Sequence, residues 1–360
     1  MDDDSLAALE ERMSAANLRG QWQMDSNRPQ KVSKDQTGVT RVEPVPAGST
    51  HVWRWHDVQP LLESACVAMP ESFTARRALI LSNPGLQRGT THTLIASIQT
   101  VRPGEIAWSH RHVINALRFS IQGSEKVLTV VDGRELIMEP HDLILTPGWA
   151  WHDHHNESDQ DAIWLDALDV PFTLALNQQF YEELGEKAQA RVLTDQDAPL
   201  FRTALVAPDP TARPYRYAWR HMRQRIEGVS DADAWHGSRV EYINPLSGGP
   251  ILPTIAAYVQ VLPPGFDGLF HRSTASEIAF IIEGQGEVRL EDKSVSWSEK
   301  DCLALPNWSK RRFVNSSKSD RAVLFVLTDK PILDAFGYLK TEREETDARR
   351  AGGVRRAAAE

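Results

Sequence analysis

Alternating apolar and polar positions between residues 117 and 145 predict a run of antiparallel strands. Leu117 to Val131 reads as two strands interrupted at Gly123, because successive side chains of a strand point to opposite faces. Val131-Asp132-Gly133 is a hairpin signal, and Leu136 to Leu145 reads as a further strand. The middle of the chain is therefore predicted to be β-sheet with tight connections.

Helical spacing is found around these strands. Residues 5–19 place Leu6, Leu9 and Met13 on one face, and helices are also predicted at 57–69, 175–188 and 214–227. Residues 24–49 are polar and contain prolines, so we expect an extended or partly disordered arm. The charged tail after Lys340 has few large apolar residues, so we expect either a frayed helix or disorder. The helix predicted at 214–227 is basic and amphipathic, which favours a solvated or intersubunit face.

The strand pattern occurs twice along the chain. Recurring segments are Asn83-Pro84 and Asn244-Pro245, Thr93 to Gln99 and Thr254 to Gln260, Gly104 and Gly265, His110 and His271, Gly123 and Gly284, Pro147 and Pro306, Asn156 and Asn315. Two copies of one strand pattern predict two similar β-barrels, closed as jelly rolls. We expect an all-β protein with a helix and arm at 1–50, barrels at 51–172 and 241–340, a helical connection at 173–240 and a tail at 341–360.

A candidate metal site lies in the first copy. His110 and His112 share one face of a predicted strand because side chains alternate with period two, and a returning strand can bring His152 beside them. Three neutral imidazoles suit Fe, Zn, Cu or Ni rather than Mg or Ca, and the spacing alone does not choose among them. His154 shares the face of His152, whereas His155 points the other way and is expected to be solvated.

The second copy lacks this set of ligands. Its His-x-His position reads His271-Arg272-Ser273, and Arg311 stands where the first copy has its third histidine. One imidazole, the carboxylate of Glu277 and an arginine make a poor site for a divalent cation, because the guanidinium repels it. The C-terminal barrel is therefore expected to be metal-free, with a structural or interface role.

The histidine-bearing stretch resembles the two sequence motifs of the cupin superfamily. Gly104, His110, His112 and Gly123 fit the first motif, although its glutamate position is Ala116 or Leu117, and Pro147, His152 and Asn156 fit the second. Within the cupins, the sequence between about residues 50 and 172 is similar to the gentisate 1,2-dioxygenase family, and a weaker similarity continues to about residue 340. The similar segments are Arg76 to Leu79, Asn83 to Leu86, Pro103 to Glu105, Ser109 to His112, Leu145 to Trp149 and Trp164 to Asp169.

This resemblance implies a bicupin with one Fe(II) per subunit in the N-terminal cupin. Such enzymes open the ring of gentisate, salicylate or 1-hydroxy-2-naphthoate with O2, and both oxygen atoms enter the product. Arg76 aligns with a family arginine that contacts the substrate carboxylate. His154 takes the place of a residue that hydrogen-bonds substrate or O2 and moves a proton, and Asp166 aligns with a carboxylate that orients His154 or a ring substituent.

Two further features concern the substrate. Arg118 lies six residues after His112, an even spacing that puts it on the same face if the strand is unbroken, and a guanidinium there suits a buried carboxylate. Relatives that take gentisate or salicylate have an aromatic residue, Ala and Gly where this chain has Ile95-Ala96-Ser97. Ile95 and Ser97 are therefore candidate pocket residues, and a substituted salicylate or a hydroxynaphthoate becomes a credible substrate in place of gentisate.

Composition limits the partners. With 360 residues and a net charge of -9, the chain is unsuited to nonspecific binding of nucleic acid or anionic membranes, and no apolar run approaches the roughly 20 residues of a membrane span. Cys66 and Cys302 form no metal or disulfide motif, and the acidic N-terminus lacks a signal-peptide core. We expect a cytoplasmic enzyme, and the resemblance implies a homotetramer or another homo-oligomer.

Two other functions are compatible with the residues themselves. A zinc-dependent isomerase or hydrolase could use the same three histidines, with metal-bound hydroxide as the nucleophile. A noncatalytic bicupin that binds a small carboxylate is the other alternative.

Overall fold

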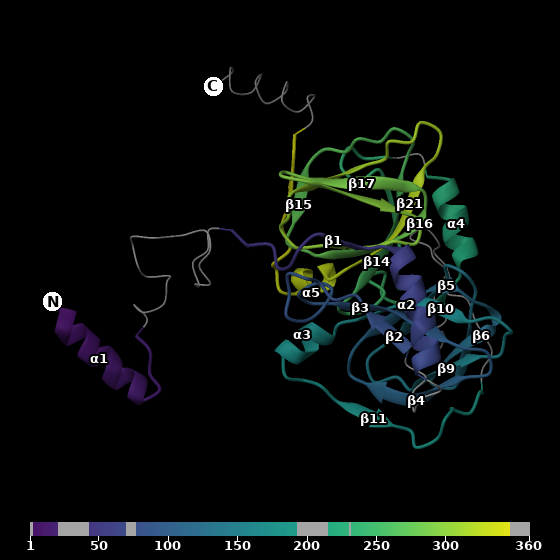
Figure 1. Cartoon of the computed structure of the whole chain (residues 1–360), viewed down its shortest axis with the longest axis horizontal. Coiled ribbons are helices and arrows are strands. Elements are labelled where there is room, and N and C mark those ends of the chain that lie inside the picture. Colours follow the sequence, from purple (N-terminus) through teal and green to yellow (C-terminus); the bar gives the residue numbers. More distant parts are fainter. Residues whose placement is uncertain (1–2, 21–42, 70–76, 193–214, 230–231, 346–360) are drawn as a thin grey trace. The chain divides into compact units, whose positions relative to one another are not determined.

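The computed structural model describes residues 3–20, 43–69, 77–192, 215–229 and 232–345 (Figure 1). The chain divides into two compact units, Met1–Val45 and Pro46–Glu360. The first unit contains helix α1 (Asp3–Ala15), which confirms the helix predicted near the N-terminus. Most of the predicted arm lies outside the described residues, and its described part, residues 43–49, has neither helix nor strand.

The second unit contains two barrels, each made of two antiparallel sheets. The sheets of the N-terminal barrel have the strand orders β12-β8-β5-β10-β3-β2 and β11-β4-β9-β6-β7. Their bounds are β2 (Arg77–Ile80), β3 (Ile95–Val101), β4 (Ile106–His112), β5 (Ala116–Gln122), β6 (Ser124–Val131), β7 (Arg134–Met138), β8 (Leu143–Thr146), β9 (His152–Asn156), β10 (Ala162–Leu168), β11 (Tyr181–Glu183) and β12 (Arg216–Tyr217).

The C-terminal barrel repeats this plan strand for strand, with the orders β1-β19-β16-β21-β14-β13 and β18-β17-β20-β15-β22. The all-β, two-barrel architecture predicted from the repeat is confirmed. The bounds are β1 (His51–Trp53), β13 (Ser238–Glu241), β14 (Ala256–Leu262), β15 (His271–Ser273), β16 (Glu277–Glu283), β17 (Gln285–Leu290), β18 (Ser294–Ser298), β19 (Cys302–Leu305), β20 (Arg311–Val314), β21 (Ala322–Thr328) and β22 (Thr341–Arg343).

The two repeats exchange their first strands. β1 precedes the N-terminal barrel in the chain but pairs with β19 of the C-terminal barrel, and β12 precedes the C-terminal barrel but pairs with β8 of the N-terminal one. Each exchanged strand leads directly into a helix, α2 (Trp55–Ala68) or α4 (Trp219–Glu227). Each barrel is therefore completed by the segment that introduces the other.

Aspartates fix the starts of both helices. Oδ1 of Asp301 accepts a hydrogen bond from the backbone N–H of Trp55 at 2.9 Å, and Oδ1 of Asp142 accepts one from the N–H of Trp219 at 2.7 Å. The first N–H groups of a helix have no partner within the helix, so a carboxylate at this point satisfies them and favours the helix dipole. In both cases the carboxylate belongs to the barrel that receives the exchanged strand.

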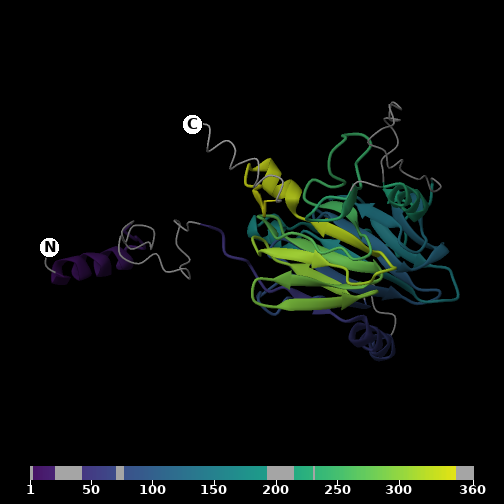
Figure 2. The ribbon, with the colours of Figure 1, turned by 90° about the horizontal axis from the view of Figure 1, so that it is seen from above.

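A third apolar core joins the barrels, in addition to the two barrel interiors. Leu117, Phe119 and Leu165 of the N-terminal barrel cluster with Phe280 and Phe325 of the C-terminal barrel. The rings of Phe119 and Phe325 stack with centroids 4.0 Å apart. Figure 2 shows the same unit from above, with the green and yellow strands of the C-terminal barrel in front of the blue strands of the N-terminal one.

Several predicted elements need correction. The helix predicted at 175–188 is wrong, because α3 (Val170–Ala175) ends where Asn177 adopts a φ of 55°, and the chain then forms β11. The helix predicted at 214–227 is present only from Trp219, since residues 216–217 pair with β8. The strand predicted at 136–145 is two strands, β7 and β8, separated by a turn in which His141 has a φ of 68°.

The remaining elements agree with the sequence pattern. The strand break at Gly123 separates β5 from β6, and the helix predicted at 57–69 is α2, beginning at Trp55. Helix α5 (Lys330–Ala335) and the short β22 follow the last strand of the C-terminal barrel, just as α3 and β11 follow that of the first. No helix in the described part of the chain is long and apolar enough to cross a membrane.

Candidate active site

The N-terminal barrel brings three histidines together. His110 and His112 alternate on β4, and His152 begins β9, which runs antiparallel to β4 with His110 opposite His152. One ring nitrogen of each residue lies within 4.8 Å of a ring nitrogen of the other two, and all three side chains are buried. Alternation on one strand and register with its neighbour are therefore sufficient to build a three-nitrogen cluster.

Backbone carbonyls fix how the three rings point. Nδ1 of His110, His112 and His152 lies 2.8, 2.8 and 3.0 Å from the carbonyl oxygens of Trp108, Ile114 and Ala150. A carbonyl only accepts hydrogen bonds, so each Nδ1 carries the proton and each Nε2 keeps its lone pair. Hydrogen bonding of this kind is typical of histidines that bind a metal through Nε2.

His152 is the most buried of the three, with 1% of its surface exposed. Its Nε2 has no hydrogen-bond partner among the residues that the structure describes. Burial lowers the pKa of His152 well below its ordinary value, and the neighbouring His110 and Arg118 lower it further. A neutral, buried imidazole with an unused lone pair fits a divalent cation of the first transition row.

The motif residues frame this cluster. Gly104 has a φ of 79° and donates its N–H to the carbonyl of Asn156 at 2.7 Å, and the side chain of Asn156 donates to the carbonyl of Val101 at 2.8 Å. Gly123 has no room for a side chain, because a Cβ there would lie 2.0 Å from the carbonyl oxygen of Met138. Gly104 and Asn156 thus tie the start of β4 to the end of β9, and Gly123 allows the tight turn between β5 and β6.

Arg118 lies in the barrel interior, but not for the reason that the spacing suggested. The chain leaves β4 after His112 and enters β5 in the other sheet, so the two residues do not share a strand. Arg118 is only 3% exposed, and its Nη1 donates a hydrogen bond to Oγ1 of Thr146 at 2.7 Å. Its positive charge also lowers the pKa of His152, after burial and the neighbouring His110.

Asp166 and Ser97 lie in one row with Arg118. The register of β5, β10 and β3 places Arg118 opposite Asp166, and Asp166 opposite Ser97. Oδ1 of Asp166 is 3.8 Å from Nε of Arg118. Ile95, at the start of β3, is two residues from Ser97 and shares its face. Arg76 lies outside the described residues.

His154 shares the inner face of β9 with His152, with ring centroids 6.0 Å apart. Its Nδ1 lies 2.8 Å from Oγ1 of Thr129, which orients the ring. The expectation of a solvated His155 is wrong. Its ring is buried, with Nε2 2.6 Å from Oδ1 of Asp153 and Nδ1 2.9 Å from Nη2 of Arg191. The segment that contains Arg191 covers this face of the strand.

Sequence reasoning missed the residues that follow α3. Tyr181 of β11 stacks on His110 with ring centroids 5.5 Å apart, because β11 pairs with β4. Next to it, Glu182 forms an ion pair with Arg111 at 2.6 Å. The guanidinium of Arg111 also lies over the rings of Trp149 and Trp151, at 4.4 and 4.5 Å. The apparent helical spacing at 175–188 hid this contact.

The matches to a known protein family fall one in each barrel. The cupin domain family matches residues 97–168 and 258–328. A 1-hydroxy-2-naphthoate 1,2-dioxygenase from Nocardioides sp. (strain KP7) is 38% identical over 351 residues, which cover 94% of this chain and 88% of that protein. A gentisate 1,2-dioxygenase from Aquipseudomonas alcaligenes is 34% identical over 85% of this chain and 90% of the relative. The chain belongs to the gentisate 1,2-dioxygenase family.

The members of this family named above are ring-cleaving 1,2-dioxygenases, and a solved structure supports the same assignment. The salicylate 1,2-dioxygenase of Pseudaminobacter salicylatoxidans superposes with a TM-score of 0.81 at 26% identity, covering 95% of this chain and 98% of that one. The resemblance stated from the sequence motifs is therefore confirmed, as is the bicupin fold. This chain is a bicupin enzyme of the ring-cleaving 1,2-dioxygenase class, with a three-histidine site in its N-terminal barrel.

Proposed function

We propose that this protein is an Fe(II)-dependent dioxygenase that opens the ring of a 2-hydroxybenzoate or a 1-hydroxy-2-naphthoate. The bond cleaved joins the carboxyl-bearing and the hydroxyl-bearing carbons. The carboxyl-bearing carbon becomes a ketone and the hydroxyl-bearing carbon a carboxylate, so each gains one atom of O2. The observation that carries the proposal is the buried cluster of His110, His112 and His152, with the buried Arg118 on the other sheet of the same barrel.

His110, His112 and His152 would hold the iron. Three protein ligands leave open positions on a six-coordinate ion, and Fe(II) with open positions is used by non-haem oxygenases to bind and activate O2. The same residues could hold Zn(II). The relatives named above are dioxygenases, and this supports iron over zinc.

Arg118 is the proposed partner of the substrate carboxylate. Its side chain is held by Thr146 at 2.7 Å and lies beside Asp166, so the guanidinium is oriented before the substrate arrives. Arg76, which lies outside the described residues, is proposed as a second partner from its alignment with the family. A buried cation favours a carboxylate-bearing ring over a neutral phenol.

His154 is the proposed proton carrier for the ring hydroxyl. It shares the inner face of β9 with His152, and Thr129 orients its ring. Asp166 is proposed to assist through its pairing with Arg118 or by contact with a ring substituent. Ile95 and Ser97 on β3 are the residues proposed to choose among ring substituents, since Ser97 lies in the row with Asp166.

Oxygen consumption by protein loaded anaerobically with Fe(II) tests the function. The panel comprises gentisate, salicylate, 5-substituted salicylates and 1-hydroxy-2-naphthoate, and we expect one O2 per substrate consumed for at least one of them. His152→Ala, folded as judged by circular dichroism, should bind no iron and consume no O2. Zinc in the freshly purified protein, together with no O2 uptake by the iron-loaded form, would overturn the proposal in favour of hydrolytic or isomerase chemistry.

We further infer that the enzyme is a cytoplasmic homo-oligomer, and the assembly that we expect is a homotetramer. The motif resemblance supports this expectation. Light scattering coupled to size-exclusion chromatography measures the assembly directly, with a mass of about four times 40.4 kDa expected.

A further inference from the structure

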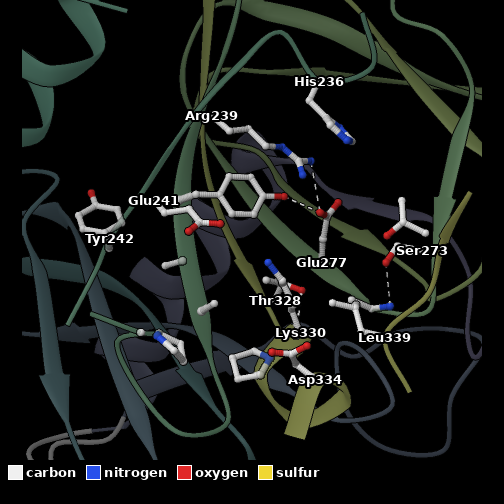
Figure 3. A pocket seen from close by; sticks show the side chains of 18 of the residues that line it. His236, Arg239, Glu241, Tyr242, Ser273, Glu277, Thr328, Lys330, Asp334 and Leu339 are labelled. Atoms are coloured by element: carbon white, nitrogen blue, oxygen red, sulfur yellow. Dashed lines mark hydrogen bonds and ion pairs between the residues drawn. The ribbon is translucent and has the colours of Figure 1, made fainter. Parts of the chain in front are cut away.

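The C-terminal barrel has a cavity where the N-terminal barrel has its histidine cluster (Figure 3). His271 pairs with Arg311 in the register of β15 and β20, as His110 pairs with His152 in the register of β4 and β9. The cavity measures about 390 Å³, which is within the usual range for sites that take small molecules. The residues of its inner part are His236, Arg239, Tyr258, His271, Glu277 and Arg311.

We propose that this cavity binds a small organic carboxylate with a flat apolar body. The protein would then have a second ligand site, one that needs no metal ion. The proposal does not depend on the dioxygenase activity, because it rests on residues of the other barrel.

The charge of the inner cavity is unbalanced. Glu277 pairs with two arginines, with Oε2 2.7 Å from Nη2 of Arg311 and Oε1 3.3 Å from Nη2 of Arg239. Burial raises the pKa of Glu277, but the two arginines hold it below its usual range, so the carboxylate is charged. Two guanidinium groups and one carboxylate leave one excess positive charge. Figure 3 shows the ion pair of Arg239 and Glu277 as a dashed line.

The histidines add no charge of their own. Burial lowers the pKa of His271 to about 3, with Arg311 adding to the effect, and burial likewise lowers the pKa of His236. Their rings meet edge to face with centroids 4.2 Å apart. A neutral pair of rings next to a fixed positive charge offers a polar edge and an apolar face to a ligand.

Buried polar atoms in the cavity wall lack partners. Arg311 is 1% exposed, and its Nη1 and Nη2 bond to protein oxygens, but its Nε has no hydrogen-bond partner in the described part of the chain. The same holds for Nδ1 of the buried His236. Both atoms belong to residues that line the cavity, so its inner end holds more polar nitrogens than protein partners for them. A carboxylate supplies acceptors for a guanidinium.

The walls favour a flat organic body over an inorganic anion. The guanidinium of Arg239 lies over the ring of Tyr258 at 4.3 Å, and Ile243, Pro250, Ala256 and Ala257 contribute apolar surface. Lys330 and Asp334 lie on the side opposite Arg239 in Figure 3, and with Arg343 and Glu241 they make a rim of mixed sign. One excess charge and apolar walls match a monocarboxylate better than a phosphate.

The two barrels thus use one location in two ways. The N-terminal barrel holds three neutral nitrogens there, and its buried cation, Arg118, lies on a strand of the other sheet. The C-terminal barrel has Arg311 in place of His152 and Tyr258 in place of Ser97, so a positive charge stands at the position of a histidine.

Isothermal titration of full-length protein freed of metal by a chelator tests the proposal. The probes are benzoate, which lacks the ortho hydroxyl of a ring-cleavage substrate, the neutral benzamide, and inorganic phosphate. We expect benzoate to bind, benzamide to bind at least tenfold more weakly, and phosphate to show no binding in the same concentration range. Binding of phosphate in preference to benzoate would overturn the assignment of the ligand.

Variants locate the site. Arg239→Met should weaken benzoate binding at least tenfold, whereas Arg118→Met, the matched change in the N-terminal barrel, should leave it within twofold. Glu277→Gln should tighten binding, because it removes the carboxylate that competes with the ligand, and a folding defect would not produce a gain. Loss of binding in Arg118→Met with no change in Arg239→Met would place benzoate in the other barrel and refute the proposal.

Discussion

At the scale of single residues, threonine hydroxyls support two of the side chains that are proposed to act on the substrate, Arg118 and His154. Thr146 accepts the hydrogen bond of Arg118, and Thr129 contacts Nδ1 of His154. Both hydroxyls are buried, so each can be replaced by the isosteric valine without opening the site. The contact of Thr146 with Arg118 concerns substrate binding, and the contact of Thr129 with His154 concerns proton transfer.

Thr146→Val should therefore raise KM for the ring-cleavage substrate by roughly tenfold, with kcat changed by less than about threefold. The loss of one hydrogen bond to a charged group costs on the order of 1.5–3 kcal/mol, and part of it falls on substrate binding. Steady-state O2 uptake measures both constants. Thr129→Val is the matched control and should lower kcat rather than raise KM; the same change in KM for both variants would contradict the assignment.

A second residue-scale prediction concerns pH. The arginines hold the pKa of Glu277 below its ordinary 4.5 even though burial raises it. A carboxyl group with a lowered folded-state pKa adds stability that is complete above about pH 4.5 and is lost as the pH falls through that lowered value. The melting temperature of Glu277→Gln should lie well below that of the wild type at pH 7, and the difference between the two melting temperatures should narrow below pH 4.5. A gap that is constant from pH 7 to pH 3 would refute this account.

At the scale of elements, the sequence predicted best what is local. Period-two alternation was enough to place His110 and His112 on one face, and the returning strand brought His152 opposite them. The even spacing from His112 predicts that Arg118 faces the interior, provided that both residues lie on one continuous strand. Arg118 does face the interior, but it lies on a strand of the other sheet. Local spacing does not reveal in which sheet a strand lies.

The elements that the sequence did not reveal are short and depend on tertiary pairing. β11 and β1 have three residues each and β12 has two, too few for a periodic signal. Tyr181 consequently appeared to belong to a helix, although its backbone pairs with His112 and its ring stacks on His110. His155 is predicted to be solvated because it points away from the face of His152, and the segment that covers it has no pattern that would reveal the cover.

The aspartates at the starts of α2 and α4 give an element-scale prediction. Asp301→Asn should cost about 1 kcal/mol of unfolding free energy, typical of a helix cap, since its partner Arg54 is 31% exposed. Asp142→Asn should cost more, about 3–5 kcal/mol, because the side chain of Arg216 is 1% exposed and would lose a buried carboxylate. Urea denaturation measures both values. Equal losses of unfolding free energy in the two variants would show that the buried Asp142–Arg216 ion pair adds no stability beyond that of a helix cap.

At the scale of the whole second unit, the barrels share an apolar core and exchange strands, so we expect them to unfold together. Phe119 is fully buried between the barrels and stacks on Phe325. Phe119→Ala should cost about 3–5 kcal/mol and lower the temperature of a single transition. The surface control Phe336→Ala, 58% exposed, should change stability by less than about 0.5 kcal/mol. Two separate calorimetric transitions in the wild type would contradict this coupling.

The exchange of first strands also has a consequence for the origin of the chain. A single-repeat ancestor with the same pairing would have been a domain-swapped homodimer, each copy lending its leading strand to the other. Joining the two genes would convert that dimer into one polypeptide without any new contact. After such a fusion, only one half need keep the three-histidine cluster, while the other must persist because its partner is incomplete without it. The second half is then free to acquire chemistry of its own.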